Sequence, residues 1–170
     1  MLGLPKGKVF LVPWTIEWET EFLLEKKRIQ DVINDYIVDI HHIGSTAVRN
    51  LSAKPIIDIA IELQDFKDGE KCVNALKELG YSYKGTNILP DRHYFNKGEP
   101  RTHQIHMYQS GSKYLLEQLS FRDYLRENET ARNQYEKLKQ KLSAHSQGNK
   151  HRYSEDKTDF VNSILNKIIK

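Results

Sequence analysis

The sequence predicts a protein of the α/β (α+β) class, in which a sheet-containing core precedes a helical C-terminal third. Apolar, β-branched runs that are typical of strands cover 37–43, 54–63 and 102–109. Helical spacing of apolar residues precedes, separates and follows these runs. We therefore expect one domain over 1–170, with its sheet within about 14–111 and helices over about 112–170. This order excludes a β-sandwich and a helical bundle.

The remaining elements follow from local signals. Thr15 is a good N-cap for a first helix that reaches Tyr36, with Glu17 and Glu19 where the helix dipole favours acids. Gly44 to Thr46 breaks the first strand. We further expect an extended N-terminal arm, a helix over 65–79, short strands over 81–84 and 93–96, helices after Ser112 and Asn128, a polar loop over 143–152 and a last helix capped by Ser154.

Composition and charge narrow the class of protein. With 170 residues, of which 38% are hydrophobic, the chain can bury a core. Its net charge of +3 is too mild for a typical nucleic-acid binder and suits a local basic pocket for an anionic ligand. The sequence has neither an apolar run of about 20 residues nor a secretory leader pattern. Because Cys72 is the single cysteine, we exclude an intramolecular disulfide and expect a cytoplasmic protein without a membrane partner.

The most informative motif is the Gly44-Ser45 pair directly after the first predicted strand. Glycine allows close approach of a ligand and serine supplies a hydroxyl, while the following N–H groups, from Thr46 onward, can face a phosphate. The next strand then carries Asp58, whose carboxylate can hold a divalent cation against that phosphate. The combination indicates a phosphate and metal site.

This arrangement resembles the nucleotidyltransferase superfamily, in which a Gly-Ser pair precedes an Asp-x-Asp/Glu strand. It resembles the GrpB family, also called UPF0157, more closely. The resemblance rests on His42-Ile-Gly-Ser-Thr-Ala-Val48, Ala53-Lys-Pro-Ile-Ile-Asp-Ile59, Thr102-His-Gln-Ile-His-Met107 and Phe121-Arg-Asp-Tyr-Leu-Arg126, with Arg152-Tyr-Ser and Lys157 near the end. It runs from about Trp14 to the C-terminus. It implies a nucleotidyltransferase-like mixed sheet with flanking helices, but it names no reaction.

Three positions depart from the patterns of these families. Ala60 stands where the superfamily has its second carboxylate. Glu62 lies four residues beyond Asp58 on the same strand, about 13 Å away, too far to share one ion. Residues 104–106 read Gln-Ile-His in place of a His-x-His, and residues 49–50 read Arg-Asn in place of Pro-Gly. The usual two-carboxylate, two-metal arrangement is therefore incomplete.

Three side chains remain as candidate metal ligands: His42, Asp58 and His106. By the resemblance, the strand of His106 corresponds to the one that brings the superfamily's third acid. The superfamily implies Mg²⁺ or Mn²⁺, whereas a mixed His and Asp set suits Zn²⁺, manganese or iron better than magnesium. The alternative is structural: histidines at strand ends are often hydrogen-bonded core groups, and Asp58 can form an ion pair with Lys54 or Arg92.

The expected ligand is a small nucleotide or another anionic phosphate. Its phosphate would contact Gly44, Ser45 and Thr46, with Lys54 and Arg92 offsetting the charge. Asp58 and Ser45 are the candidate catalytic residues.

Three functions stay open from the residues. The first is a metal-dependent nucleotidyltransferase. The second is a catalytically degenerate nucleotide or anion binder, which Ala60 favours. The third is a metal-dependent hydrolase that uses His42, Asp58 and His106. The acceptor substrate, the base preference and the oligomeric state are left open.

Overall fold

The structure, a computed structural model, describes residues 1–145 and 150–169, with the side chains of 1–144 and 157–169. Its helices and strands are α1 (Ile16–Ile33), β1 (Ile37–Ile43), β2 (Ile57–Leu63), α2 (Val73–Glu78), β3 (Tyr81–Gly85), β4 (Arg92–Lys97), β5 (His103–Gln109), α3 (Lys113–Glu127), α4 (Glu129–His145) and α5 (Lys150–Ile168). Three 3₁₀ segments join them: η1 (Asn34–Tyr36), η2 (Ser45–Ala47) and η3 (Phe66–Cys72).

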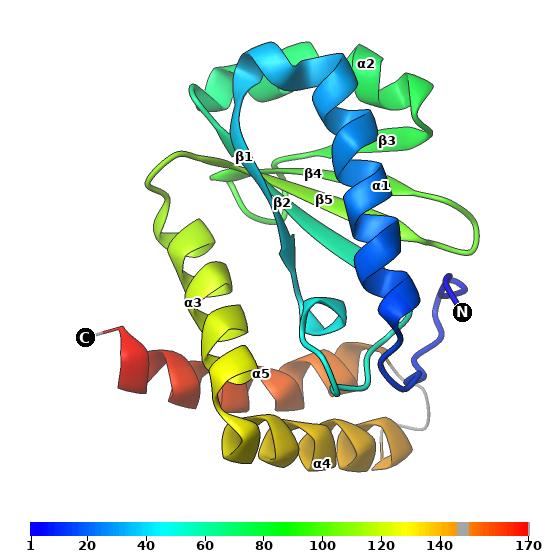
Figure 1. The fold of residues 1–170 in the computed structure, drawn as a ribbon, viewed down its shortest axis with the longest axis vertical. Coiled ribbons are helices and arrows are strands. Elements are labelled where there is room, and N and C mark those ends of the chain that lie inside the picture. Colours follow the sequence, from blue (N-terminus) through cyan, green and yellow to red (C-terminus); the bar gives the residue numbers. More distant parts are fainter. Residues whose placement is uncertain (146–149, 170) are drawn as a thin grey trace.

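The five strands form one mixed sheet in the order β1-β2-β5-β4-β3 (Figure 1). β2 and β5 are parallel, and the other neighbouring strands are antiparallel. The predicted α/β class with a mixed sheet is confirmed. Asp58 is the second residue of β2, an interior strand, as the β-branched pattern around it predicts.

One face of the sheet packs against α1 (Figure 1). The predicted cap is confirmed, because the Thr15 hydroxyl accepts a hydrogen bond of 3.3 Å from the N–H of Glu17. Alternation along β2 sends every second side chain toward α1. The core on this face contains Trp18, Phe22, Ile29 and Ile33 of α1 with Ile57, Ile59, Ile61 and Leu63 of β2.

The C-terminal helices gather at the end of the sheet where β1 finishes and β2 begins (Figure 1). α3, α4 and α5 pack on one another, which confirms the predicted helical third. A second apolar cluster joins the segment after η2 to α3 and α4: Val48, Leu51, Leu125, Ala131 and Tyr135. In the described ranges, no helix combines the length and apolar character needed to cross a membrane.

Two element predictions are wrong in detail. The helix expected over 65–79 is the 3₁₀ segment η3 followed by a short α2. Gly69 in η3 lies against the His93 ring, where a Cβ would come within 2.2 Å, so packing rather than propensity shapes this segment. The loop expected over 143–152 is helical at both ends, because α4 reaches His145 and α5 starts at Lys150, before the predicted cap Ser154; residues 146–149 lie outside the described residues. Ala144, Lys150 and Arg152 at the two ends of this range are good helix formers, so its polar composition did not identify a loop.

Candidate functional site

A cavity of about 250 Å³ lies where the start of β2 meets η2 and the C-terminal helices. Five predicted site residues line it: Gly44, Ser45, Thr46, Lys54 and Asp58. The helices add charged side chains that the sequence reasoning did not assign to the site, namely Arg122, Lys139 and Lys157. His42, Arg92 and His106 are not among the lining residues.

Gly44 brings the backbone unusually close to Asp58. Its φ of 74° lies in the left-handed region that favours glycine. A Cβ at this position would stand 2.9 Å from Oδ2 of Asp58. The segment that follows is the 3₁₀ turn η2, three residues long, rather than the start of an α-helix. Any phosphate contact at Ser45 and Thr46 would therefore depend on local N–H and hydroxyl groups, without a helix dipole behind them.

Asp58 is held by a hydrogen-bonded chain from two other strands. The guanidinium of Arg92 can only donate, so its Nη1 donates to Nδ1 of His106 at 3.1 Å. Nε2 of His106 must then carry the proton of the neutral ring and donates to Oδ1 of Asp58 at 3.1 Å. Arg92 also lies over the Tyr94 ring, 4.9 Å from its centroid. Both ring nitrogens of His106 are engaged, so this geometry makes it an orienting group for Asp58 rather than a metal ligand.

The ionised form of Asp58 is favoured in the folded chain. Burial is the largest influence on its pKa and raises it. The hydrogen bond from His106 and the nearby charges of Lys54 and Lys157 outweigh that effect and hold the pKa of Asp58 below 3.8. Since 31% of its side chain remains accessible, the carboxylate is charged and open to a ligand.

The prediction that His42 lies beside Asp58 as a metal ligand is wrong. Antiparallel pairing places His42 opposite Ile59 and Ile43 opposite Asp58, so His42 and Asp58 point to opposite faces of the sheet. The His42 ring stacks on Phe22 at 4.6 Å, and its Nε2 lies 3.0 Å from the Thr46 hydroxyl. Burial lowers the pKa of His42 to about 4, so it is a neutral core residue near pH 7.

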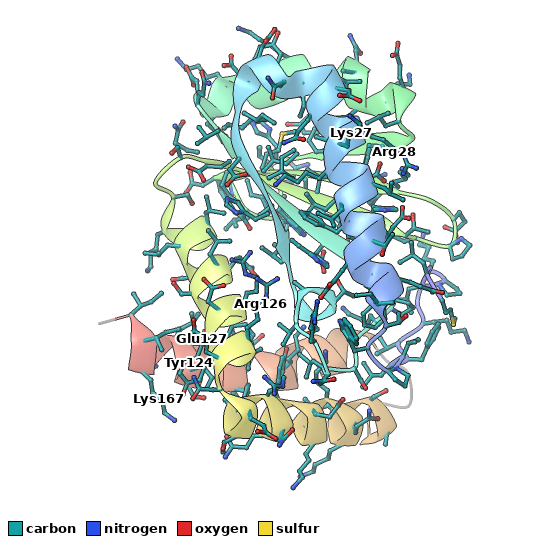
Figure 2. All side chains as sticks on the ribbon, in the orientation of Figure 1. Lys27, Arg28, Tyr124, Arg126, Glu127 and Lys167 are labelled. Carbon is teal, nitrogen blue, oxygen red and sulfur yellow. The ribbon has the colours of Figure 1, made fainter. Side chains whose placement is uncertain are left out.

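Arg92, which is predicted to contact phosphate, does not line the cavity, whereas basic residues of the C-terminal helices do. Arg122 donates from Nη1 to the carbonyl of His42 at 3.1 Å and lines the cavity. Arg126, in contrast, points from α3 to the segment after β1, where Nε donates to the carbonyl of Ala47 at 2.9 Å (Figure 2). Arg126 therefore ties α3 to η2, a structural role.

Lys139 of α4 is a buried lysine that lines the cavity. Lysines at positions 137, 139 and 141 are typical of a solvated helix face, yet Lys139 is 2% exposed and donates to the carbonyl of Ser52 at 2.6 Å. Burial lowers the pKa of Lys139 well below its ordinary value, and the neighbouring positive charges add to this effect. Helical spacing gives a usable signal, because Tyr135, Lys139 and Leu142 share the buried face of α4.

Glu62 does not complete the site, as its distance along β2 predicts. Its carboxylate accepts from the Ser110 hydroxyl at 2.7 Å and lies 3.3 Å from Nε2 of His41. Asp58 is thus the single carboxylate among the described residues that line the cavity. The basic side chains in the same lining are Lys54, Arg122, Lys139 and Lys157. Burial lowers the pKa of Lys139 and of Lys157, and a neighbouring negative charge raises such a pKa again.

Comparison with known proteins settles the family. The sequence model described as GrpB protein matches residues 8–167. The chain belongs to the GrpB family. It is 37% identical over 158 residues to UPF0157 protein YqkA of Bacillus subtilis, covering 92% of this chain and 46% of that protein. It is 36% identical to glutamate-rich protein GrpB of Alkalihalophilus pseudofirmus, covering 99% of this chain and 100% of that protein. The chain thus spans about half the length of YqkA and the full length of the second relative.

Solved structures support the family and the fold. The crystal structure of GrpB from Enterococcus faecalis matches with a TM-score of 0.86 and 30% identity, over 95% of this chain and 100% of that chain. A structure of the Cid1 poly(U) polymerase with bound MgGTP matches with a TM-score of 0.54 and 10% identity, over 76% of this chain and 44% of that chain. The second likeness shows a nucleotidyltransferase-like fold and nothing finer.

Proposed function

We propose that this GrpB protein binds a nucleoside phosphate together with a divalent cation in the cavity beside Asp58 and transfers a nucleotidyl group from it. The observation that carries the proposal is a single ionised carboxylate set against Lys54, Arg122, Lys139 and Lys157 around one cavity. A polyanion that carries its own metal ion complements both parts of this arrangement. The bound MgGTP of the distant Cid1 structure is consistent with that ligand class.

The chemistry of Asp58 favours Mg²⁺ or Mn²⁺ over Zn²⁺ in this role. Mg²⁺ is usually bound through one or two carboxylates, substrate phosphates and several waters. With His106 committed to Oδ1, the other oxygen of Asp58 would hold the cation. Gly44 and Ser45 would contact phosphate, and Ser45 would place its hydroxyl beside the transferring group. The lysines and Arg122 would stabilise the charge that develops on the phosphate oxygens.

A second candidate is a nucleotide-binding protein without catalysis, and Ala60 favours it. A complete two-metal centre needs carboxylates that bridge two ions about 3.5–4 Å apart. Ala60 leaves Asp58 without that partner on β2. The third candidate, a His and Asp metallohydrolase, loses support because His42 lies on the other face of the sheet and both ring nitrogens of His106 are engaged.

Calorimetric titration tests the proposal, with each of the four ribonucleoside triphosphates as ligand and with MgCl₂, MnCl₂ or EDTA. We expect metal-dependent binding, and we expect Asp58→Asn to weaken it at least 100-fold while its thermal melting stays near that of the parent. Glu62→Gln is the matched control, because it neutralises a carboxylate on the same strand and face outside the cavity. It should bind like the parent.

Product analysis separates the two leading candidates. Release of pyrophosphate from a bound triphosphate, with the nucleoside monophosphate group recovered on an acceptor rather than free in solution and with both products lost in Asp58→Asn, identifies nucleotidyl transfer. Metal-dependent binding without turnover identifies the degenerate binder. If folded Asp58→Asn retains parental metal-dependent affinity, the proposed role of Asp58 is wrong.

A further inference from the structure

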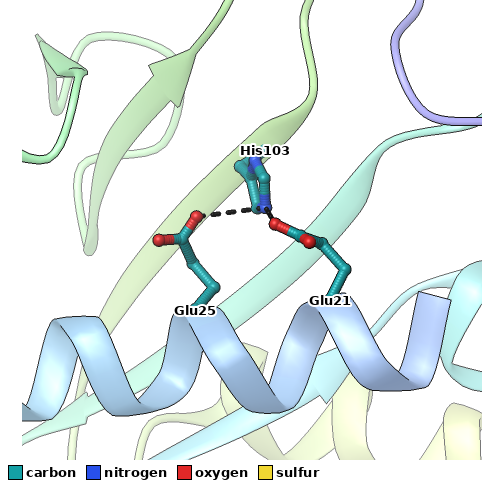
Figure 3. A group of neighbouring side chains, drawn as sticks. All are labelled: Glu21, Glu25 and His103. Atoms are coloured by element: carbon teal, nitrogen blue, oxygen red, sulfur yellow. Dashed lines mark hydrogen bonds and ion pairs between the residues drawn. The ribbon is translucent and has the colours of Figure 1, made fainter. Parts of the chain in front are cut away.

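A separate cluster of ligand-type side chains lies on the α1 face of the sheet, away from the cavity. Glu21 and Glu25, one turn apart on α1, face His103 at the start of β5 (Figure 3). Nε2 of His103 lies 3.2 Å from Oε1 of Glu21 and 3.1 Å from Oε2 of Glu25. Glu25 and His103 are buried, whereas 29% of the Glu21 side chain is exposed and offers a path from solvent.

The spacing of these three atoms suits a small tetrahedral cation. A Zn²⁺ ion with bonds of about 2.0–2.1 Å to nitrogen and oxygen keeps its ligand atoms about 3.3 Å apart. The two measured separations are close to that value, and the three ligand atoms all lie within 4.8 Å of one another. An ion could therefore enter with little movement of α1 or β5.

Hydrogen bonding orients His103 for this role. Nδ1 lies 2.8 Å from the hydroxyl of Thr102, and that hydroxyl donates to the carbonyl of Lys97 at 3.3 Å. This contact fixes the ring so that Nε2 faces the two carboxylates, which can only accept a hydrogen bond; without a metal ion, Nε2 therefore carries a proton, which a bound cation would displace.

Two buried oxygen atoms lie at the inner end of this cluster. Among the described residues, Oε1 of Glu25 and the hydroxyl of Tyr81 are buried without a hydrogen-bond partner. Glu25 is 0% exposed, and its charge contributes to the raised pKa of Tyr81. Leaving such groups unsatisfied costs about 1–3 kcal/mol each. An ion bound through Oε2, the oxygen that faces His103, would offset the buried negative charge of Glu25 together with Lys97.

Two basic side chains, Lys97 and Arg28, lie beside the cluster and can accommodate a bound ion. Lys97 donates from Nζ to Oε2 of Glu25 at 2.7 Å and can remain as an outer hydrogen bond to a ligating carboxylate. Arg28, labelled on α1 in Figure 2, lies 3.8 Å from a carboxylate oxygen of both glutamates, with 49% of its side chain exposed. It can swing outward when an ion enters.

We propose that Glu21, Glu25 and His103 form a structural site for a zinc-class divalent cation that ties α1 to β5. One imidazole nitrogen with two carboxylates suits Zn²⁺ or Co²⁺ better than Mg²⁺. The fourth position would hold water reached from the Glu21 side. This site lies across the sheet from Asp58, so it is independent of nucleotide binding.

Titration of the metal-free protein with Co²⁺ and Zn²⁺ tests the site. We expect one Co²⁺ to bind with the intense visible absorption of tetrahedral coordination, and Zn²⁺ to displace it. Saturating Zn²⁺ at about 100 times its Kd should raise the melting temperature by about 5–10 °C. Glu21→Gln, at the least buried ligand, should weaken the affinity at least tenfold, while Asp58→Asn and the control Glu62→Gln should leave it unchanged.

Nitrogen NMR of the unaltered protein gives a readout that needs no variant. Zn²⁺ should shift the ring nitrogens of His103 and leave those of His93, a buried histidine of the same face, in place. The proposal is overturned if Zn²⁺ neither shifts His103 nor binds, or if metal affinity is lost in Asp58→Asn and kept in Glu21→Gln.

Discussion

His103 and His106 lie three residues apart on β5 and show how differently the two faces of one sheet are built. His103 lies beneath α1, between two glutamates, with Lys97 and Arg28 beside them. His106 contacts one carboxylate, that of Asp58, which opens into a cavity lined by basic side chains. Charges on the α1 face are largely balanced within the chain, whereas the described lining of the cavity carries four basic side chains and one carboxylate. The first arrangement pairs opposite charges inside the chain, and the second underlies the proposal of an anionic ligand.

The largest expected effect is a difference in the free energy of unfolding between substitutions at two neighbouring residues of β2, Ile59 and Asp58. Ile59→Ala should lower the free energy of unfolding by about 2–5 kcal/mol, because Ile59 is fully buried against α1. Asp58→Asn, one residue away on the cavity face, should change it by under about 1 kcal/mol. Urea unfolding of both variants measures the difference. Similar losses of stability in the two variants would contradict the conclusion that Ile59 serves the core and Asp58 serves the cavity.

Acid should destabilise the α1 face through His42. Its folded pKa of about 4 lies below its ordinary 6.5, so the unfolded chain binds more protons between these values. The stability from keeping His42 neutral is complete above pH 6.5 and is lost as the pH falls toward 4, by roughly 3 kcal/mol. Unfolding measured from pH 7 to 4 should therefore show a flatter dependence in His42→Gln. A slope equal to that of the parent would contradict this origin.

On the cavity face, Lys139→Met should weaken nucleotide binding by about 10- to 100-fold. It removes a buried amine that lines the cavity and that a bound phosphate would hold in its protonated form, while methionine keeps most of the side-chain volume. Lys137→Met, on the exposed side of the same helix, is the control and should bind normally. Calorimetry with a triphosphate measures both. Equal affinity of the two variants would place the phosphate elsewhere.

The smallest effect tests the orienting role of His106. His106→Gln should lower metal-dependent affinity about tenfold and raise the pKa of Asp58, because the hydrogen bond that helps to depress that pKa is lost. The same substitution should have no further effect on affinity in an Asp58→Asn background. Carboxylate NMR and a double-mutant cycle provide the two measurements. Additive losses would show that His106 acts on the ligand directly.

The strands and the residues of the Gly44-Ser45 and Asp58 motif were predictable because they depend on short-range sequence patterns. The runs around Ile40, Ile59 and Ile105 predict strands, and the Gly44-Ser45 pair followed by Asp58 identifies the residues that now meet at the cavity. The glycine is required by local geometry, namely a positive φ and a close approach to Asp58. The opposite directions of His103 and His106 also follow from strand periodicity alone.

What the sequence by itself determined is therefore the class of each element and the residues of the β1–β2 motif, since propensity and periodicity act within a few residues. Tertiary structure alone decided which neighbour each side chain meets. The register of β1 on β2 sent His42 to the core face, and the fold of α3–α5 over the sheet buried Lys139 and brought Arg122 to the cavity. The pairing of Glu21 and Glu25 with His103, about 80 residues later, likewise exists only once α1 covers β5. Such contacts depend on long-range packing, which local pattern does not encode.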